Sequence, residues 1–205
     1  MDQKTLDELL DFHLLVLKDI FHGLSISEIE QKYPDKMVKL NYLSIAKANN
    51  LLTFDDSNNL IGAYPVSPLK TSFEVAIDNI GTSYCMCAID ALGIAYTFNE
   101  KTTIRSKDKS TGEKIEITVD PISEKIVSDK QYYVTYKDPS KVCNIAQDQC
   151  PVINFYSERG SIPNDNDLII FDFNQAIKHA KSIFSQKAFK KSLLEGFKAI
   201  PKENL

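Results

Sequence analysis

The sequence contains no run of about 18 apolar residues, so it predicts no membrane-spanning helix. Glycine and proline are scarce, with 7 and 8 residues among 205, which excludes a fibrous or low-complexity chain. No sign of charge dominates: 24 basic and 28 acidic side chains leave a net charge of -4, which gives no reason to expect a dedicated nucleic-acid binder. Tryptophan is absent, and the 4 cysteines are too few for a disulfide scaffold.

What the chain does contain is an ordinary globular composition, with 43% hydrophobic and 25% charged residues. Its acidic, amphipathic start lacks the basic region and cleavage site of a secretory signal, and we expect a cytoplasmic protein with reduced thiols. In that compartment, thiols confined to residues 85–150 indicate chemistry or metal binding more than disulfide bridges.

Residues 1–66 are predicted to form a winged helix-turn-helix-like module. Apolar residues at helical spacing predict a first helix over residues 7–22. A capping-box pattern at residues 25–28 opens a second helix, and a third is expected over residues 35–48. Two extended segments around a loop of turn residues, 55–59, complete the module with a β-hairpin.

A winged helix raises the question of DNA binding. The third predicted helix carries lysines but no arginine, and the hairpin loop carries Asp55 and Asp56. Arginine is favoured for reading guanine, and carboxylates repel phosphate, so nucleic acid is not an expected partner. The alternative is that the module packs on the rest of the chain or on another protein.

Residues 67–205 are predicted to form a mixed core of antiparallel β-sheet and helices, which makes the whole chain α+β. The nearly apolar stretch Tyr84–Ile94 is most easily interpreted as a buried helix. The other elements expected in this core are strands at 71–77, 102–105, 114–119, 131–136 and 151–156, and a helical tail over 174–197.

Within the apolar stretch, Cys87 and Asp90 are three residues apart and lie on one face of a helix, whereas Cys85 points elsewhere. An aspartate in apolar surroundings is costly unless it is paired, hydrogen-bonded or protonated. Burial raises the pKa of its carboxyl, which can then hold or deliver a proton near neutral pH. The alternative is structural: Asp90 caps a shorter helix, and Cys87 is a small core residue.

A second candidate, Cys150, stands where a polar loop becomes a buried strand. The spacing of Cys85, Cys87, Cys143 and Cys150 does not match a zinc ribbon or finger. The three histidines lie on predicted helices outside the cysteine region, which disfavours a Cys–His nucleophile. A redox pair is disfavoured as well, because a C-x-C spacing on a helix separates the two thiols.

Taken together, these features resemble the organomercurial lyases (alkylmercury lyases) over about residues 10–190. The first matching motif is Cys-Ala-x-Asp, which extends here from Cys87 to Asp90. The second is a cysteine directly before a hydrophobic segment ending in aromatics, as Cys150 precedes the segment that ends at Tyr156. The order of the winged-helix-like module, the linker and the two distant cysteines makes the resemblance specific.

The sequence also departs from the family pattern. Met86 stands where the family often has a tryptophan, and Cys85 and Cys143 are additional thiols beside the two matched ones. We expect these two to be accessory thiols; the alternative is that they take no part in the chemistry. The departures bear on substrate range and leave the three matched residues in place.

The resemblance implies an enzyme that cleaves carbon–mercury bonds by protonolysis, converting R–Hg⁺ and H⁺ to RH and Hg(II). In that reaction the thiolates of Cys87 and Cys150 would bind mercury, which prefers sulfur ligands, and Asp90 would relay the proton. The implied partners are an organomercurial small molecule, cellular thiols and a mercuric reductase, without a required cofactor or a membrane. The alternative is a divergent member that binds or senses soft metals without lyase activity, as a DNA-binding regulator or otherwise.

Overall fold

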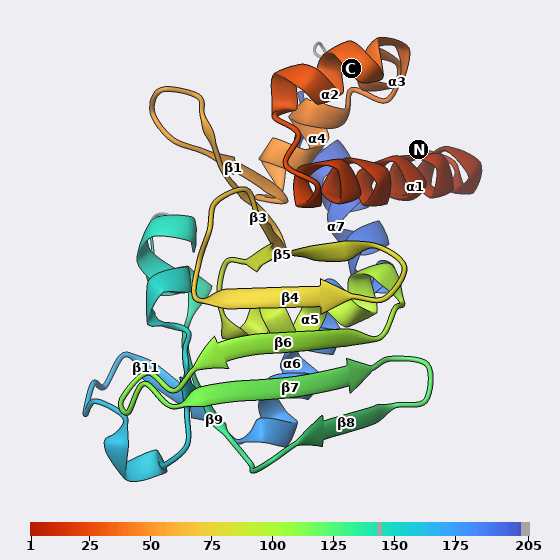
Figure 1. The fold of residues 1–205 in the computed structure, drawn as a ribbon. Helices are drawn as coiled ribbons and strands as arrows, with labels where there is room; N and C mark the ends of the chain where they lie inside the picture. Colours follow the sequence, from red (N-terminus) through yellow and green to blue (C-terminus); the bar gives the residue numbers. More distant parts are fainter. Residues whose placement is uncertain (143–144, 202–205) are drawn as a thin grey trace.

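An eight-stranded antiparallel sheet forms the centre of the fold in the computed structural model, which describes residues 1–142 and 145–201 (Figure 1). Its strand order is β1-β2-β3-β5-β4-β6-β7-β8. The strands are β1 (Leu52–Phe54), β2 (Leu60–Ala63), β3 (Val66–Ser67), β4 (Phe73–Ile77), β5 (Gly81–Cys85), β6 (Thr102–Lys107), β7 (Lys114–Asp120) and β8 (Lys125–Ser128). The expected N-terminal hairpin is present as β1 and β2, and through β3 its hydrogen bonding continues into the rest of the sheet.

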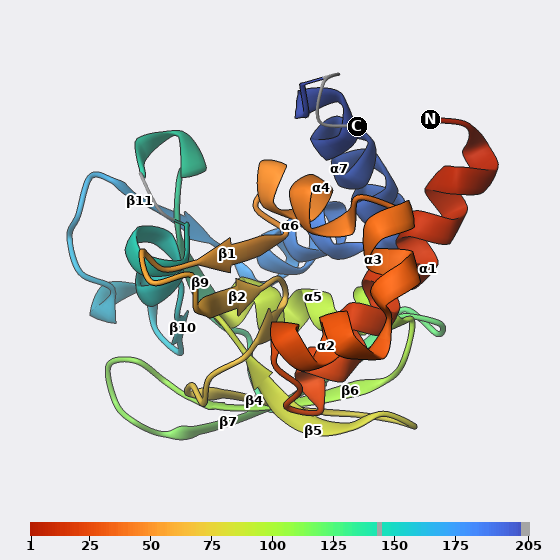
Figure 2. The same cartoon turned by 90° about the horizontal axis from the view of Figure 1, so that it is seen from above.

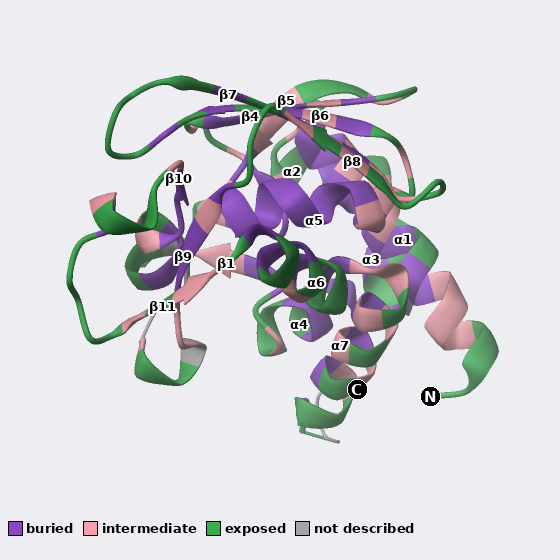
Figure 3. Cartoon of the chain, turned by 90° about the horizontal axis from the view of Figure 1, so that it is seen from below, coloured by how far each residue is buried: buried purple, intermediate pink, exposed green. Residues whose placement is uncertain are grey.

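The sheet has one buried and one exposed face because its long strands alternate. Val75, Ile104 and Ile117 are completely buried on the inner face, whereas Arg105 and Glu116 are exposed on the outer face. This alternation is what predicted β4, β6 and β7 from the sequence. The inner face is covered by the helix α5, which is buried along nearly its whole length (Figure 3).

Seven α-helices surround the inner side and the upper edge of the sheet in the described part of the chain (Figures 1 and 2). They are α1 (Gln3–Phe21), α2 (Ile26–Lys32), α3 (Pro34–Lys39), α4 (Tyr42–Ala48), α5 (Ala88–Phe98), α6 (Phe173–Phe184) and α7 (Gln186–Ala199). Within the described residues, no helix is long and apolar enough to cross a membrane. The structure is therefore a mixed α+β fold built on antiparallel sheets, as predicted.

The N-terminal helices follow the prediction with two differences. The first helix begins earlier than expected, at Gln3, because the Asp2 carboxylate accepts a hydrogen bond from the Thr5 backbone N–H at 2.8 Å and caps it. The predicted third helix over 35–48 is wrong as a single element, since Asn41 takes a left-handed conformation (φ 46°) and divides it into α3 and α4.

The apolar stretch Tyr84–Ile94 is only partly helical, which corrects the sequence interpretation. Its first residues belong to β5, where Cys85 pairs with Phe73 of β4, and the helix α5 begins at Ala88. A short apolar run fits a buried strand as well as a buried helix, and the pairing with β4 decides the matter.

The region that follows β8 forms a second sheet with order β10-β9-β11, at one end of the large sheet. Its strands are β9 (Tyr133–Lys137), β10 (Phe155–Tyr156) and β11 (Leu168–Phe171). The strand predicted over 151–156 is present only at its end, because Cys150–Val152 forms a 3₁₀ turn around Pro151, which has no backbone N–H to pair.

The helical tail is likewise two helices where one was expected. Ser185 adopts an extended conformation at the end of α6, and its hydroxyl accepts a hydrogen bond from the Ala188 N–H that caps α7. The turn allows α6 to pack on α5 while α7 packs on α1 and α4. Helices from both ends of the chain therefore pack against one another.

Candidate active site

The first cysteine of the site lies at the junction between β5 and α5. Cys87 is the N-cap of α5, with an extended backbone, and its carbonyl accepts a hydrogen bond from the Ala91 N–H at 2.9 Å. Asp90 belongs to the first turn of the helix. The i, i+3 neighbourhood expected for these two residues therefore holds, although Cys87 caps the helix and is not part of it.

The second cysteine is brought to this junction by hydrogen bonds from two sides. The Ala88 N–H at the start of α5 donates to the Ile153 carbonyl at 3.2 Å, three residues beyond Cys150. On the other side, Thr135 of β9 donates its N–H to the Asn154 carbonyl and accepts the Asn154 N–H on its hydroxyl at 3.1 Å. These backbone contacts fasten the segment after Cys150 between α5 and β9.

As a result, Cys87, Asp90 and Cys150 form one buried cluster, although the two cysteines are 63 positions apart (150 − 87). Their sulfur and carboxylate atoms lie within 4.8 Å of one another, and none of the three residues is more than 5% exposed. Two thiols and one carboxyl at this separation could hold a soft metal ion, because thiolates are its preferred ligands.

The cluster opens on a cavity of about 350 Å³. Its wall contains aliphatic, aromatic and amide side chains besides the cluster itself: Leu51, Ile89, Ile153, Ile183, Tyr64, Tyr136, Phe184, Asn49, Asn50 and Gln149. Phe184 of α6 reaches this wall because α5 has a glycine at position 93, where a Cβ atom would lie 2.3 Å from the phenylalanine ring. The cavity is large enough for a small organic group.

Burial controls the proton affinity of the carboxyl group. It raises the pKa of Asp90 from 3.8 to about 7, and hydrogen bonds from the thiol and backbone N–H of Cys87 oppose this increase. Within the described part of the chain, the Oδ2 atom of Asp90 is buried and has no hydrogen-bond partner. Near neutral pH the group is therefore divided between carboxylate and carboxylic acid, and one oxygen faces no protein partner.

The thiol of Cys87 is held in its protonated form for the same reason. Burial raises its pKa well above the usual range, and the neighbouring Cys150 thiol and Asp90 carboxylate raise it further. The backbone N–H of Asp90 acts in the opposite direction. A ligand that binds this sulfur must displace its proton, and Asp90 is the nearest group able to accept one.

The sulfur of Cys150 contacts a hydroxyl group that the sequence did not point to. The Sγ of Cys150 donates a hydrogen bond to the Tyr64 Oη at 3.6 Å, and both residues are buried. Burial, together with the charges of Cys150 and Asp90, raises the pKa of Tyr64 far above its usual range. The hydroxyl therefore keeps its proton at neutral pH.

Cys85, the other candidate thiol among the described residues, is not in the cluster. Cys85 is completely buried as the last residue of β5, paired with Val66 and Phe73, and it does not line the cavity. Cys143 lies outside the described residues. The prediction that either one is an accessory thiol stays a prediction.

Three residues of the cavity wall had no signal in the sequence. Tyr64 ends the hairpin next to a segment interpreted as a linker, Tyr136 looks like any strand residue, and Gln149 belongs to a polar loop. Each approaches the cluster only through tertiary contacts. Gln149, for example, is fixed by donating its side-chain amide to the Lys137 carbonyl.

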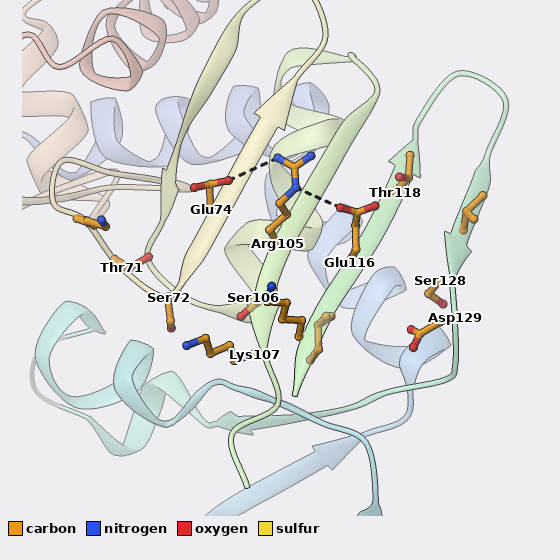
Figure 4. A pocket seen from close by; sticks show the side chains of 14 residues that line it. Thr71, Ser72, Glu74, Arg105, Ser106, Lys107, Glu116, Thr118, Ser128 and Asp129 are labelled. Atoms are coloured by element: carbon orange, nitrogen blue, oxygen red, sulfur yellow. Dashed lines mark hydrogen bonds and ion pairs between the residues drawn. The ribbon is translucent and has the colours of Figure 1, made fainter. Parts of the chain in front are cut away.

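A second concave surface, a groove of about 1020 Å³, lies on the outer face of the sheet (Figure 4). Arg105 of β6 lies between two glutamates there. Its Nη1 is 3.5 Å from the Oε1 of Glu74, and its Nε is 3.1 Å from the Oε2 of Glu116. No cysteine or histidine is among the described residues that line this groove. Its carboxylates are exposed and have partners, and the hydrogen bond from the Tyr132 hydroxyl lowers the pKa of Asp129, so the groove offers no acid that holds a proton near neutral pH.

Comparison with known proteins finds a matching family and a similar solved structure. The sequence model of the MerB family, described as alkylmercury lyase, matches residues 66–184, which contain all three residues of the cluster. A solved structure described as the mercury-bound form of MerB2 is similar in fold, with a TM-score of 0.62 and 20% identity, and the match covers 93% of this chain and 97% of that one. A search of curated proteins gave no match.

Proposed function

The chain belongs to the alkylmercury lyase family, and on this premise we propose that Cys87, Cys150 and Asp90 cleave the carbon–mercury bond of an organomercurial substrate by protonolysis. The observation that carries the proposal is the buried cluster itself. Two sulfur atoms and a carboxylate oxygen lie within 4.8 Å of one another at the end of a cavity, and Oδ2 of Asp90 is without a partner in the described structure.

The first steps load mercury onto the two sulfurs. The Cys87 sulfur bonds to the mercury of R–Hg⁺, and the thiol proton passes to the Asp90 carboxylate. The Cys150 sulfur then bonds to the same mercury and releases its proton to solvent. Soft thiolates are the ligands that Hg(II) prefers, so these bonds displace the oxygen or nitrogen ligands that the substrate brings.

The last step breaks the carbon–mercury bond. Donation from two sulfurs builds negative charge on the carbon, and Asp90 in its acid form delivers the proton that it holds. The sum is R–Hg⁺ plus two thiols giving RH, a Cys87–Hg–Cys150 bridge and one H⁺, so atoms and charge balance. A carboxyl whose pKa is about 7 suits both halves of this relay.

The remaining expectations belong to the same proposal. Mercury enters as part of the substrate, and no further cofactor takes part in these steps. Small cellular thiols, and a mercuric reductase after them, would remove Hg(II) from the two cysteines, because thiol exchange at mercury is the chemistry that loaded it. These acceptors are thiol systems of the cytoplasm, which is where we expect the protein to act.

The N-terminal part is proposed to be a winged-helix-like module, residues 1–66, joined to a lyase core, residues 67–205. Such a module was expected to need three helices and a hairpin; the chain has the β1–β2 hairpin and four helices, the third having divided into α3 and α4, and Asn49, Asn50 and Tyr64 lie at the cavity wall. This placement favours a role in covering the site over a role in binding DNA.

The test is turnover of phenylmercury in excess dithiothreitol, with benzene measured in the headspace by gas chromatography. Wild-type protein should release benzene continuously, and Cys87→Ser should release none. Cys85→Ala is the matched control, because it removes a thiol two positions away that does not line the cavity. If wild-type protein binds phenylmercury but yields no benzene, the protein binds soft metals without being a lyase.

A further inference from the structure

The loop between β2 and β3 places one tyrosine hydroxyl against a sulfur of the cluster. Tyr64 is 7% exposed, and its Oη lies 3.6 Å from the Sγ of Cys150. A buried tyrosine hydroxyl usually finds a hydrogen-bond partner, and which partner it finds shows what the hydroxyl can act on. Here the hydroxyl is hydrogen-bonded with the side chain of Thr53 and also accepts the thiol of Cys150, a member of the cluster.

The ring of Tyr64 is held from several sides. Its backbone N–H donates to the Leu51 carbonyl at 3.1 Å, which ties it to the start of β1. A Cβ atom at Gly62 would lie 2.6 Å from the Thr53 hydroxyl and 3.4 Å from two ring atoms of Tyr64. Thr53 and the ring therefore occupy the space over the glycine, and the ring has little freedom to swing away.

The Cys150 side of this contact is fixed as well. The Ile153 N–H donates to the Cys150 carbonyl at 3.1 Å, and Asn154 donates its side-chain amide to the Pro151 carbonyl at 2.9 Å. The backbone around Cys150 is thus set, while its side chain still has a rotatable Cα–Cβ bond. Outside the cluster, the sulfur of Cys150 is hydrogen-bonded to the hydroxyl of Tyr64.

We propose that Tyr64 is a positioning residue for the lyase reaction, whose hydroxyl directs the Cys150 sulfur toward Cys87 and Asp90 for the second bond to mercury. The inference rests on the proposed function. In the free protein the thiol donates to the hydroxyl oxygen. When mercury replaces the thiol proton, the same hydroxyl rotates and donates to the sulfur, since a phenol can act as donor or acceptor.

This role separates the two bonds to mercury. Cys87 is placed by the start of α5 and needs no help from Tyr64 for the first capture of substrate. The second bond depends on where the Cys150 sulfur points. Removing the hydroxyl should therefore slow the steps after capture and weaken the two-sulfur product complex, while substrate capture stays nearly unchanged.

The experiment compares Tyr64→Phe with Tyr42→Phe. Tyr42 is the matched control, because its hydroxyl is also buried and hydrogen-bonded, to His13 at 2.8 Å, and it does not line the cavity. With phenylmercury, kcat of Tyr64→Phe should fall about 10- to 100-fold with KM within about twofold, as for a lost hydrogen bond to a charged group. Tyr42→Phe should keep both constants within about twofold of wild type.

A second measurement does not depend on lyase activity. Affinity for Hg(II), measured by competition with dithiothreitol, should fall about 10-fold in Tyr64→Phe and stay unchanged in Tyr42→Phe. Replacement of Tyr64 by para-aminophenylalanine keeps the ring and a donor, and it should restore most of both properties. This variant also allows the comparison to be made if circular dichroism shows that Tyr64→Phe is unfolded.

Two results would overturn the inference. In the first, Tyr64→Phe has the same kcat and the same Hg(II) affinity as wild-type protein. In the second, Tyr64→Phe and Tyr42→Phe lose kcat and Hg(II) affinity to the same extent. Failure of the proposed function looks different. In that case wild-type protein releases no benzene, whereas the Hg(II) affinities of the variants still show whether Tyr64 positions Cys150.

Discussion

The buried cavity and the outer groove each contain carboxylates, but the two regions surround them differently. Asp90 in the cavity is 3% exposed, and its Oδ2 has no partner in the described part of the chain. The side chains of Glu74 and Glu116 in the groove are 39% and 65% exposed, and Arg105 lies between them. The glutamates of the larger concavity are thus less reactive than Asp90, since both are exposed to solvent and paired with an arginine.

The same difference applies to what a bound molecule would meet. In the groove, charges are screened by solvent and an ion pair contributes at most about 1 kcal/mol. In the cavity, a carboxyl and two thiols are buried close together, so each proton or metal ion that binds one of them strongly changes the proton affinity of the others. Substitutions in the two regions should therefore differ in effect by orders of magnitude.

The largest expected effect is the loss of a sulfur from the cavity. Cys150→Ser should lower phenylmercury turnover by at least about 10³-fold, because a hydroxyl is a poor ligand for mercury and removing one member of a catalytic set usually costs that much or more. Benzene release per unit time measures it. Turnover within tenfold of wild type would mean that Cys150 is not a mercury ligand in the reaction.

Next in size is the loss of the acid. Asp90→Asn should lower the rate of benzene release by about 10² to 10⁴-fold, the usual contribution of a positioned general acid. Binding of phenylmercury to the two sulfurs should remain, as seen by mass spectrometry of the intact adduct. Loss of binding together with loss of turnover would instead assign Asp90 a ligand role.

The raised pKa of Asp90 also predicts a stability effect of opposite sign to that of most acids. The folded state holds the proton up to about pH 7 and the unfolded state only to about 3.8, so wild-type stability should fall as pH rises between these values. The loss is at most about 4 kcal/mol. Asp90→Asn should remove most of this slope and be the more stable protein at pH 8.

Urea unfolding at a series of pH values measures the slope in both proteins. Parallel curves for wild type and Asp90→Asn between pH 4 and 8 would show that the carboxyl is ordinary, and the contrast with the groove would then disappear.

The smallest expected effect lies in the groove. Glu116→Gln removes the negative charge from the 3.1 Å contact with Arg105 and should cost less than about 1 kcal/mol in unfolding free energy, since the pair is exposed. Turnover should stay within about twofold of wild type. A large loss of turnover in this variant would place part of the active machinery on the outer face of the sheet.

Much of the fold could be predicted because its long strands alternate and its caps are local. Val75, Ile104 and Ile117 alternate with exposed residues, and the capping box of Ser25 and Glu28 is present as expected. The boundaries that failed depend on contacts far along the chain. Cys85 pairs with β4, so a run that reads equally well as helix becomes a strand.

The candidate site divides in the same way. The Cys87–Asp90 neighbourhood is local and needs only a helix start, so sequence reasoning could reach it. That Cys150 lies beside them was implied only by the family resemblance, because the hydrogen bonds with Ala88 and Thr135 that place it there are not visible in any spacing. Tyr64 is a stronger example, because its position follows from the path of a hairpin that the sequence showed only as strand, turn and linker.

The most direct test of the central claim is a single turnover without added thiol. One equivalent of phenylmercury mixed with reduced protein should give one benzene per chain and leave Hg(II) on the protein. In peptide mass spectrometry after denaturation, Cys87 and Cys150 should be the two thiols that are alkylated less than in mercury-free protein. Intact phenylmercury bound to a single cysteine, with no benzene released, would contradict the account.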